Sequence, residues 1–179
     1  RDEAKVTKKT RKTEKFYNLP PIVDFDAVFI PEEPKAIGQI IPTFSYRDAG
    51  KVRFLGISAW HSPELLTRTQ GFAEGAVFVD AYNGAATDVA TDEFVNQYKA
   101  LRGIVAETAA MEAIAYDAAG LLRNILLNND VHSRERFTDL VRSLSGYTGV
   151  TGKMAYADGD LTRNFRILTV KKGQIEEEK

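Results

Sequence analysis

The stretch FDAVFIPEEP, residues 25–34, contains the transition that decides the fold. Five of its first six residues are apolar, and the last four read PEEP. A short apolar run with aromatic and β-branched residues is typical of a buried strand, and proline cannot continue a central strand. The sequence therefore predicts a strand over residues 22–30 that ends in a polar loop.

A regular order of strands and helices follows this first strand. Ile37, Ile41 and Phe44 recur at helical spacing, and Pro42 predicts a kink between them. Ser62-Pro63 is a typical helix start, with serine as the N-cap and proline in the first turn. Alternation of this kind is typical of an α/β layered fold with a parallel sheet. The predicted elements are strands over 22–30, 52–57 and 75–82 and helices over 34–48 and 63–69.

The second half of the chain is mostly helical. Three helices are predicted, over 92–102, 108–127 and 133–144, before a closing strand over 165–170 and a hydrophilic tail. The middle helix is alanine-rich and apolar around most of its circumference, so we expect it to be deeply packed. The residues that we expect in its core face are Met111, Ala115, Ala118 and Leu122.

Composition sets outer limits on the function. The chain has 179 residues, 44% of them hydrophobic, and a formal net charge of -1, which argues for neither nucleic acid nor a membrane surface as partner. It has no cysteine, so disulfides and thiolate sites are excluded. No apolar run is long enough for a membrane helix, and the start shows no signal peptide. Residues 1–21 begin with many basic side chains and are expected to form a basic linker or disordered start, with a nucleic-acid arm as the less favoured alternative.

Four segments together resemble a known family. They read FDAVFIPEEPKAIGQIIPTFSYRDAGKVRFLGISAW, EGAVFVDAY, AYDAAGLLRNIL and GVTGKMAYADGDLTRNFRILTVKKGQI. In order and spacing, they resemble the second lobe of type I periplasmic solute-binding proteins, in the group of leucine/isoleucine/valine-binding proteins and penicillin-binding-protein activators. The resemblance extends over about residues 22–175.

The resemblance implies a division of the chain into lobes. Members of the family are about twice this length, so the chain resembles their C-terminal half, with a Rossmann-like parallel-sheet lobe and extra helices that belong to the other lobe. Two crossings between lobes are expected near 82–90 and 158–164. The implied parts are a linker over 1–21, the α/β part of lobe two over 22–82, a helical part packing with lobe one over 83–164, and a return strand with a polar tail over 165–179.

The ends of the predicted strands are the candidate binding site, because open parallel sheets bind ligands beyond the carboxyl ends of their strands. We expect the strands to run in one direction and to gather their polar ends at one mouth. Trp60 can form a wall of this cleft or belong to the core, and both alternatives stay open. Glu32 or Glu33 can bind an ammonium group, although a solvated helix N-terminus explains them more simply. The candidate ligand-binding residues are Pro31, Glu32, Glu33, Ser58, Ala59, Trp60 and Tyr82, with Asn83 following the last.

The loop after the second predicted strand departs from the family pattern. Amino-acid binders of this family carry an acidic residue there, whereas this loop reads GISAWHS. A branched-chain amino acid is therefore not the expected ligand. Another small solute, a peptidoglycan-related ligand or a protein partner remains open.

The resemblance favours a binding protein over an enzyme. The first hypothesis is an extracytoplasmic receptor of an ABC-type uptake system, periplasmic or lipid-anchored, which closes on a small amino-acid-like or amide solute and delivers it to a membrane transporter. The alternative is a regulatory protein of the penicillin-binding-protein activator type, with a cell-wall synthesis protein as partner. We expect no cofactor and no nucleic-acid partner, and we expect the fragment to form a homodimer through unpaired edges and bare helix faces.

Two weaker hypotheses complete the set. Ser58, His61 and Asp80 contain the residue types of a hydrolase triad, but no G-x-S-x-G elbow accompanies them. His61 and His132 are the only histidines and lie far apart in the sequence, so no metal site is expected.

Overall fold

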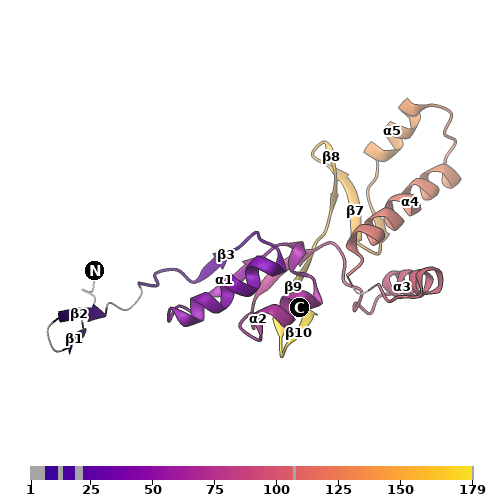
Figure 1. Ribbon diagram of the computed structural model, residues 1–179. Helices are drawn as coiled ribbons and strands as arrows, with labels where there is room; N and C mark the ends of the chain where they lie inside the picture. The colour runs from indigo at the N-terminus through magenta and orange to yellow at the C-terminus, as the bar shows by residue number, and fades with distance from the viewer. Residues whose placement is uncertain (1–6, 12–13, 19–21, 107, 179) are drawn as a thin grey trace.

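The computed structural model describes residues 7–11, 14–18, 22–106 and 108–178. The chain forms a sheet part and a helical part, joined by two crossing segments (Figure 1). Within the basic start, an antiparallel hairpin pairs β1 (Thr7–Arg11) with β2 (Glu14–Asn18), which the sequence did not predict. The rest of the predicted linker lies outside the described residues.

A five-stranded sheet in the order β10-β9-β5-β4-β3 organises the sheet part. The pairs β3–β4 and β4–β5 are parallel, so the predicted direction of the first three strands is confirmed. The closing strand β9 runs antiparallel to β5, and there the expectation of a single direction was wrong. The reason is the route of the chain: it returns from the helical part at the carboxyl end of β5, where Asp80 faces Arg166, and must run backwards. The strands are β3 (Ala27–Phe29), β4 (Arg53–Gly56), β5 (Val77–Asp80), β9 (Arg166–Lys171) and β10 (Gln174–Glu177).

Two helices and a short 3-10 turn cover one face of this sheet. They are α1 (Pro34–Tyr46), η1 (Ser58–Trp60) and α2 (Pro63–Thr69). The predicted start of α2 is confirmed, because the Ser62 side chain accepts a hydrogen bond from the Glu64 amide at 3.1 Å. This cap satisfies one of the amides that a helix start leaves without a partner.

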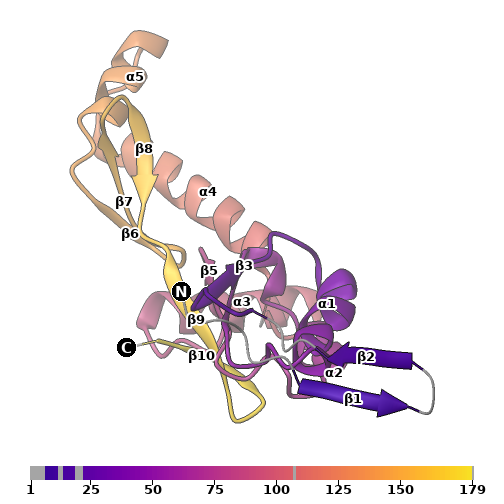
Figure 2. The ribbon, with the colours of Figure 1, turned by 90° about the vertical axis from the view of Figure 1, so that its left-hand side faces the viewer.

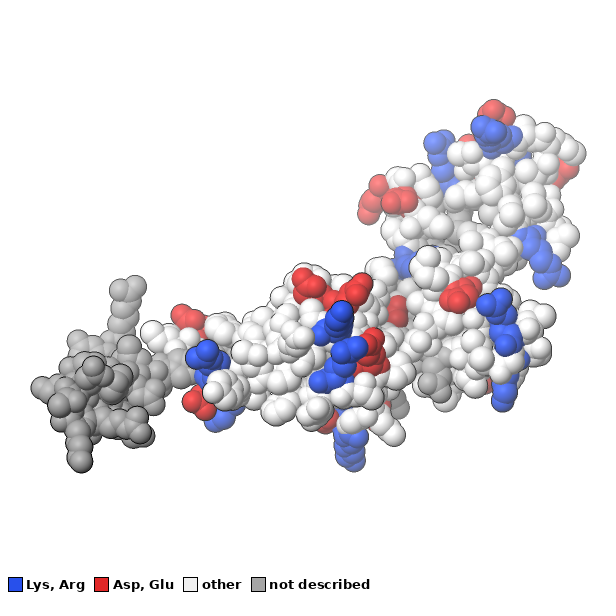
Figure 3. All heavy atoms as spheres, in the orientation of Figure 1, with Lys and Arg blue, Asp and Glu red and all other residues white. Residues whose placement is uncertain are grey.

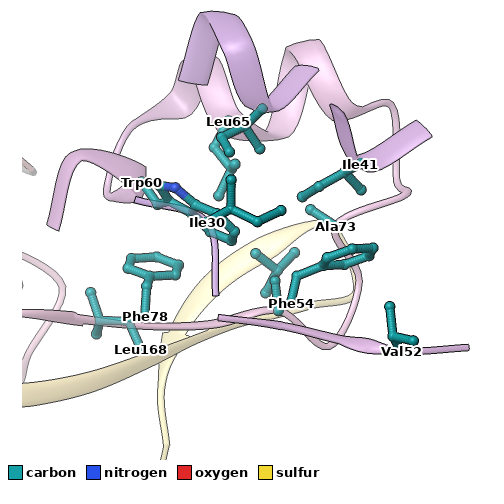
Figure 4. Close-up of a cluster of buried hydrophobic side chains, with 12 residues drawn as sticks. Ile30, Ile41, Val52, Phe54, Trp60, Leu65, Ala73, Phe78 and Leu168 are labelled. Carbon is teal, nitrogen blue, oxygen red and sulfur yellow. The ribbon is translucent and has the colours of Figure 1, made fainter. Parts of the chain in front are cut away.

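The main hydrophobic core lies between these helices and the sheet. Figure 4 shows Trp60 enclosed above Phe78, with Leu168 nearby in the strand layer. A Cβ atom on Gly56 would lie 2.2 Å from the Trp60 ring, so only glycine lets the indole sit directly on β4. The buried members of this core are Ile30, Ile37, Ile41, Val52, Phe54, Trp60, Leu65, Ala73, Ala76, Phe78, Leu168 and Val170.

The opposite face of the same sheet is exposed. Phe29, Val79 and Ile167 point to this side, and 59%, 44% and 49% of their surfaces are accessible. Register places Phe29 beside Leu55, and Val79 beside Ile167. Parallel sheets normally bury both faces, so this sheet has half of its usual cover within the described residues.

The helical part contains the three predicted helices. Asp88 caps α3 and Ser133 caps α5, each by accepting a hydrogen bond from an amide in the first turn. A second, smaller core joins Tyr82 and Phe94 to Ala113 and Val150. The helices are α3 (Val89–Arg102), α4 (Ala110–Asn128) and α5 (Arg134–Arg142).

A three-stranded antiparallel meander packs beside α4 (Figure 2). An Asp-Gly turn joins its last two strands: Asp158 and Gly159 both have positive φ, 53° and 89°, as a two-residue hairpin of type I′ requires. The strands are β6 (Tyr147–Gly149), β7 (Gly152–Ala157) and β8 (Asp160–Arg163).

A buried carboxylate fastens α4 to this meander. Asp117 is 1% exposed and accepts hydrogen bonds from the Val150 amide at 2.8 Å and from the Thr151 amide at 2.7 Å, as well as from the Thr151 hydroxyl. A Cβ atom on Gly149 would lie 2.4 Å from the Asp117 carboxyl, so glycine is required for this approach. A buried carboxylate needs such donors because its desolvation is otherwise too costly.

This contact reverses the predicted core face of α4. Met111, Ala115, Ala118 and Leu122 are exposed, so the prediction that they form the core was wrong. The helix is apolar around most of its circumference, so periodicity did not select one side. The residues that α4 buries are Ala113, Asp117, Leu121 and Ile125.

The surface carries charges of both signs. On the face seen in Figure 3, Lys and Arg are interspersed with Asp and Glu over both parts. Among the described residues, no helix combines the length and the apolar character that crossing a membrane requires.

Candidate functional site

The carboxyl ends of β3, β4 and β5 lie together, and two hydrogen bonds connect them. The Trp60 indole N–H donates to the Glu32 carbonyl at 3.0 Å, which ties the loop after β4 to the loop after β3. His61 Nδ1 lies 2.7 Å from Asp80 Oδ2, which ties the loop after β4 to the end of β5. The three strand ends therefore form one continuous region.

Two of the candidate ligand-binding residues are enclosed. Trp60 and Tyr82 have no accessible surface in the structure, so neither ring presents a face to a solute. Trp60 belongs to the main core, the alternative that the sequence left open. The Tyr82 hydroxyl donates to the Ala106 carbonyl, and burial raises the pKa of this phenol to about 12. Both rings fix the loops around the site from within.

The other candidate residues are accessible to solvent. Pro31, Glu32, Glu33 and Ser58 are exposed, and Ala59 is half-buried. Glu33 occupies the N-cap position of α1 but makes no side-chain cap bond there. Glu33 therefore lies at a solvated helix N-terminus, which was the simpler of the two explanations for the glutamates.

A cavity of about 410 Å³ opens between the sheet part and the helical part. One wall comes from α2, the first crossing and β10, and the other from the loop between α3 and α4. The cavity borders the carboxyl ends of two strands, because His61 lies in the segment after β4 and Asn83 lies in the segment after β5. Its lining residues are His61, Pro63, Leu66, Asn83, Gly84, Ala85, Val105, Thr108, Gln174 and Ile175.

His61 is held in this wall by a buried carboxylate. Asp80 is 4% exposed; its Oδ1 accepts from the Ala81 amide at 2.6 Å, and its Oδ2 is the atom in contact with His61. Because an ionised carboxylate only accepts hydrogen bonds, the Nδ1 atom of His61 carries the proton. The ring orientation and the tautomer are therefore set by Asp80.

The sequence named His61 only as a triad or metal candidate. Its signal was its place directly after the GISAW loop, with an acidic residue ending the next strand. Val105 and Thr108 had no comparable signal, since only the folded chain brings the α3–α4 loop to the strand ends.

An ion pair joins the two crossings between the parts. Arg166 Nη2 lies 3.0 Å from Asp88 Oδ2, and Arg166 Nη1 lies 2.9 Å from Glu177 Oε2. Burial would raise the pKa of the Asp88 carboxyl, but hydrogen bonds from Thr91 and Arg166 outweigh it and lower the pKa below its usual value. The pair connects the start of α3 with the start of β9, so it links the helical part to the sheet part.

The structure does not assemble the residues of the hydrolase hypothesis into a relay. The His61–Asp80 contact is present, but the bond between Ser58 and His61 is a backbone one, from the His61 amide to the Ser58 carbonyl at 2.9 Å. No bond between the Ser58 hydroxyl and the His61 ring occurs among the described residues. Likewise, no group of three or more His, Asp or Glu side chains in the described part of the chain is placed to hold a metal ion.

Comparison with solved structures places the fold. A protein of branched-chain amino acid ABC transport from Rhodospirillum rubrum matches with a TM-score of 0.75 and 24% identity, over 86% of this chain and 44% of the other. A branched-chain amino acid substrate-binding protein from Streptococcus pneumoniae, solved with isoleucine, matches at 0.61 and 22% over 86% and 44%. A solute-binding protein from R. palustris, solved with benzoate, matches at 0.57 and 15% over 85% and 42%.

These matches confirm the predicted fold: the chain has the mixed α/β fold of type I periplasmic binding proteins. It spans less than half the length of the solved structures that it matches. No family model matches the sequence. No curated protein matches it either.

Proposed function

We propose that this chain is part of a solute-binding receptor that serves an ABC-type transporter outside the cytoplasmic membrane. The observation that supports this most is the cavity beside the carboxyl ends of β4 and β5, which the α3–α4 loop of the helical part closes from the other side. Strand ends of a parallel sheet are the usual ligand site of open α/β folds. The matched structures are transport proteins for small solutes, one of them solved with isoleucine and another with benzoate.

The mechanism we propose is hinge closure. The sheet part and the helical part are connected by two crossings, and the cavity has walls from both. A ligand that contacts both walls stabilises the closed arrangement relative to the open one, by as much as its affinities for the two differ. None of the seven candidate ligand-binding residues lines this cavity. In this mechanism Trp60 and Tyr82 hold the loops beside it in place, and the accessible residues Pro31, Glu32, Glu33, Ser58 and Ala59 would contact only a solute that extends beyond it.

A regulatory protein with the same fold is the second candidate. The observation that favours it is the exposed apolar face of the sheet, with Phe29, Val79 and Ile167, which suits a protein partner better than a small solute. In this alternative the partner is a cell-wall synthesis protein. The same surface supports a homodimer of this chain.

A thermal-shift screen of the chain tests the solute proposal. Small amino acids and small neutral amides are added at millimolar concentration, and we expect at least one class to raise the melting temperature, since a ligand that binds only the folded state stabilises it. The buffer salts of the ligand stocks are the control. If no solute changes the melting temperature while a cell-wall synthesis protein does, the solute proposal fails and the regulatory one gains.

A further inference from the structure

The cavity between α2, the first crossing and the α3–α4 loop has a lining suited to one class of ligand. Its walls are apolar at Leu66, Val105 and Ile175. Its polar groups are neutral amides, a hydroxyl and an imidazole, from Asn83, Gln174, Thr108 and His61. None of the described lining residues is an aspartate, glutamate, lysine or arginine.

Two of these polar groups already make one hydrogen bond each within the protein, which decides whether the remaining atom can donate to a ligand or accept from it. His61 uses Nδ1 as a donor to Asp80, and in the neutral form of the ring Nε2 is then the acceptor. Asn83 accepts from the Ala85 amide with Oδ1 at 3.1 Å, so its amino group remains to donate. One acceptor and one donor on an apolar wall match the two ends of a carboxamide group.

A charged ligand end fits this lining poorly. An ammonium group would leave water with no carboxylate among the described lining residues to pair with it. A carboxylate would meet no lysine or arginine there, and the Asp80 charge lies directly behind His61. Arg166 lines an adjoining cavity that shares Asn83, Ala85, Gln174 and Ile175 with this one, and there it is paired with Asp88 and Glu177.

We propose that the cavity binds the neutral carboxamide end of a small, mainly apolar molecule. The N–H of the ligand donates to His61 Nε2, and its carbonyl accepts from the Asn83 side chain. The volume of about 410 Å³ is at the lower end of the usual range for small-molecule sites. The inference rests on the proposed solute-binding function and narrows its ligand class from amino-acid-like solutes or amides to uncharged amides alone.

Four probes with the same branched skeleton and different charge test the class: isovaleramide, isovalerate, isopentylamine and L-leucine. The chain has only two histidines, so their ring signals in NMR spectra are assigned with one variant, His132→Gln. His132 is exposed in the helical part and serves as the internal control. We expect isovaleramide to shift the His61 signals and not those of His132, with an affinity at least about tenfold above that of each charged probe, a difference of about 1.4 kcal/mol.

A substitution at the cavity wall tests the location. Val105 is 52% exposed, so Val105→Asp adds a carboxylate to the lining without creating a void in a core. We expect the preference for isovaleramide over isopentylamine to fall at least about tenfold, because the new carboxylate pairs with the ammonium group. Val89→Asp, at a valine that is 75% exposed and outside the cavity, is the matched control and should leave the preference unchanged.

The outcomes separate this inference from the proposed function. Tighter binding of L-leucine or isovalerate overturns the amide class and leaves solute binding intact. Binding of isovaleramide without any compaction in small-angle X-ray scattering supports the inference and contradicts hinge closure. A probe that compacts the chain without moving the His61 signals places the site elsewhere and overturns the inference alone. If none of the four probes binds, the inference fails for this cavity.

Discussion

The two faces of the five-stranded sheet carry side chains of the same apolar kind but differ in how much of them is buried. One face packs Phe54, Phe78 and Leu168 under α1, η1 and α2, and all three side chains are buried. The other face presents Phe29, Val79 and Ile167 to solvent. Both sets are large and apolar, so composition does not distinguish them. The difference teaches that the stability of the sheet part comes from one side of the sheet, while the other side is where we expect association.

The largest effect is expected on the covered face. Trp60→Ala removes a fully buried indole and its hydrogen bond to the Glu32 carbonyl, and we expect the free energy of unfolding to fall by about 3–5 kcal/mol. Urea unfolding followed by circular dichroism measures this loss. The control is Val79→Ala on the bare face, for which we expect a change of about 0.5 kcal/mol or less. Equal losses for the two variants would contradict the difference between the faces.

The next largest effect is expected in the helical part. Asp117→Ala leaves the buried amides of Val150 and Thr151 without their acceptor, so we expect a loss of about 3 kcal/mol in unfolding free energy. Asp139→Ala, on the exposed surface of α5, is the control and should change little. Chemical denaturation of both variants tests this, and a stable Asp117→Ala protein would show that α4 and the meander do not depend on this carboxylate.

A smaller effect, with a defined pH dependence, is expected at Tyr82. Tyr82→Phe removes the bond to the Ala106 carbonyl and should cost about 1 kcal/mol at neutral pH. Burial raises the pKa of Tyr82 from 10.0 to about 12, so between these values the folded state keeps a proton that the unfolded state has lost. Its contribution is complete below pH 10.0 and falls as the pH rises towards 12.

Alkaline unfolding of the Tyr82→Phe variant checks this sign. We expect the variant to lose less stability than the parent chain over that pH range, so the two curves converge. Tyr46→Phe is the control, because Tyr46 is 83% exposed. Parallel curves for parent and Tyr82→Phe would mean that the phenol is not buried in solution.

The smallest effect on stability, with a clear effect on association, is expected on the bare face. The double variant Phe29→Ser and Ile167→Thr should change the unfolding free energy by about 0.5 kcal/mol or less, since both side chains are exposed. We expect it to lower the self-association of the chain in sedimentation velocity, because exposed apolar patches and open strand edges promote contacts between copies. Tyr46→Ser, on α1, is the control. A parent chain that stays monomeric at every concentration would contradict the association.

The strand and helix positions were largely predictable because they depend on local patterns. Prolines located the end of β3 and the start of α1, and Ser62-Pro63 located the start of α2 to the residue. The prediction of a buried strand over 22–30 was wrong in extent and burial: only Ala27–Phe29 is a strand, and Phe29 is 59% exposed because β3 is the edge of the sheet and nothing packs on its outer face within the described residues. The direction of β9 was not predictable, because the strand pattern is the same in both directions. The strand β10 was not predicted either, because it lies in the hydrophilic tail and pairs with β9 through backbone groups, which leave no side-chain pattern.

The candidate site was predictable as a region and not as a lining. The rule for strand ends pointed to the loops that contain Ser58, Trp60 and Asn83. It did not show that Trp60 turns inward, since this depends on the space above Gly56. It also did not bring Val105 to the opposite wall, because that contact follows from how the helical part packs on Tyr82 and the first crossing.

The sequence by itself determined which segments become strands and helices, and which loops follow the parallel strands. These features arise from side-chain periodicity, caps and prolines, which act over a few neighbouring residues. Only the tertiary structure decided which side of α4 is buried, which face of the sheet is covered, and which groups surround the cavity. Burial depends on what packs against a surface, and an apolar helix or strand offers several equivalent surfaces until a partner occupies one of them, as the meander at Val150 does for α4 and Trp60 does for β4.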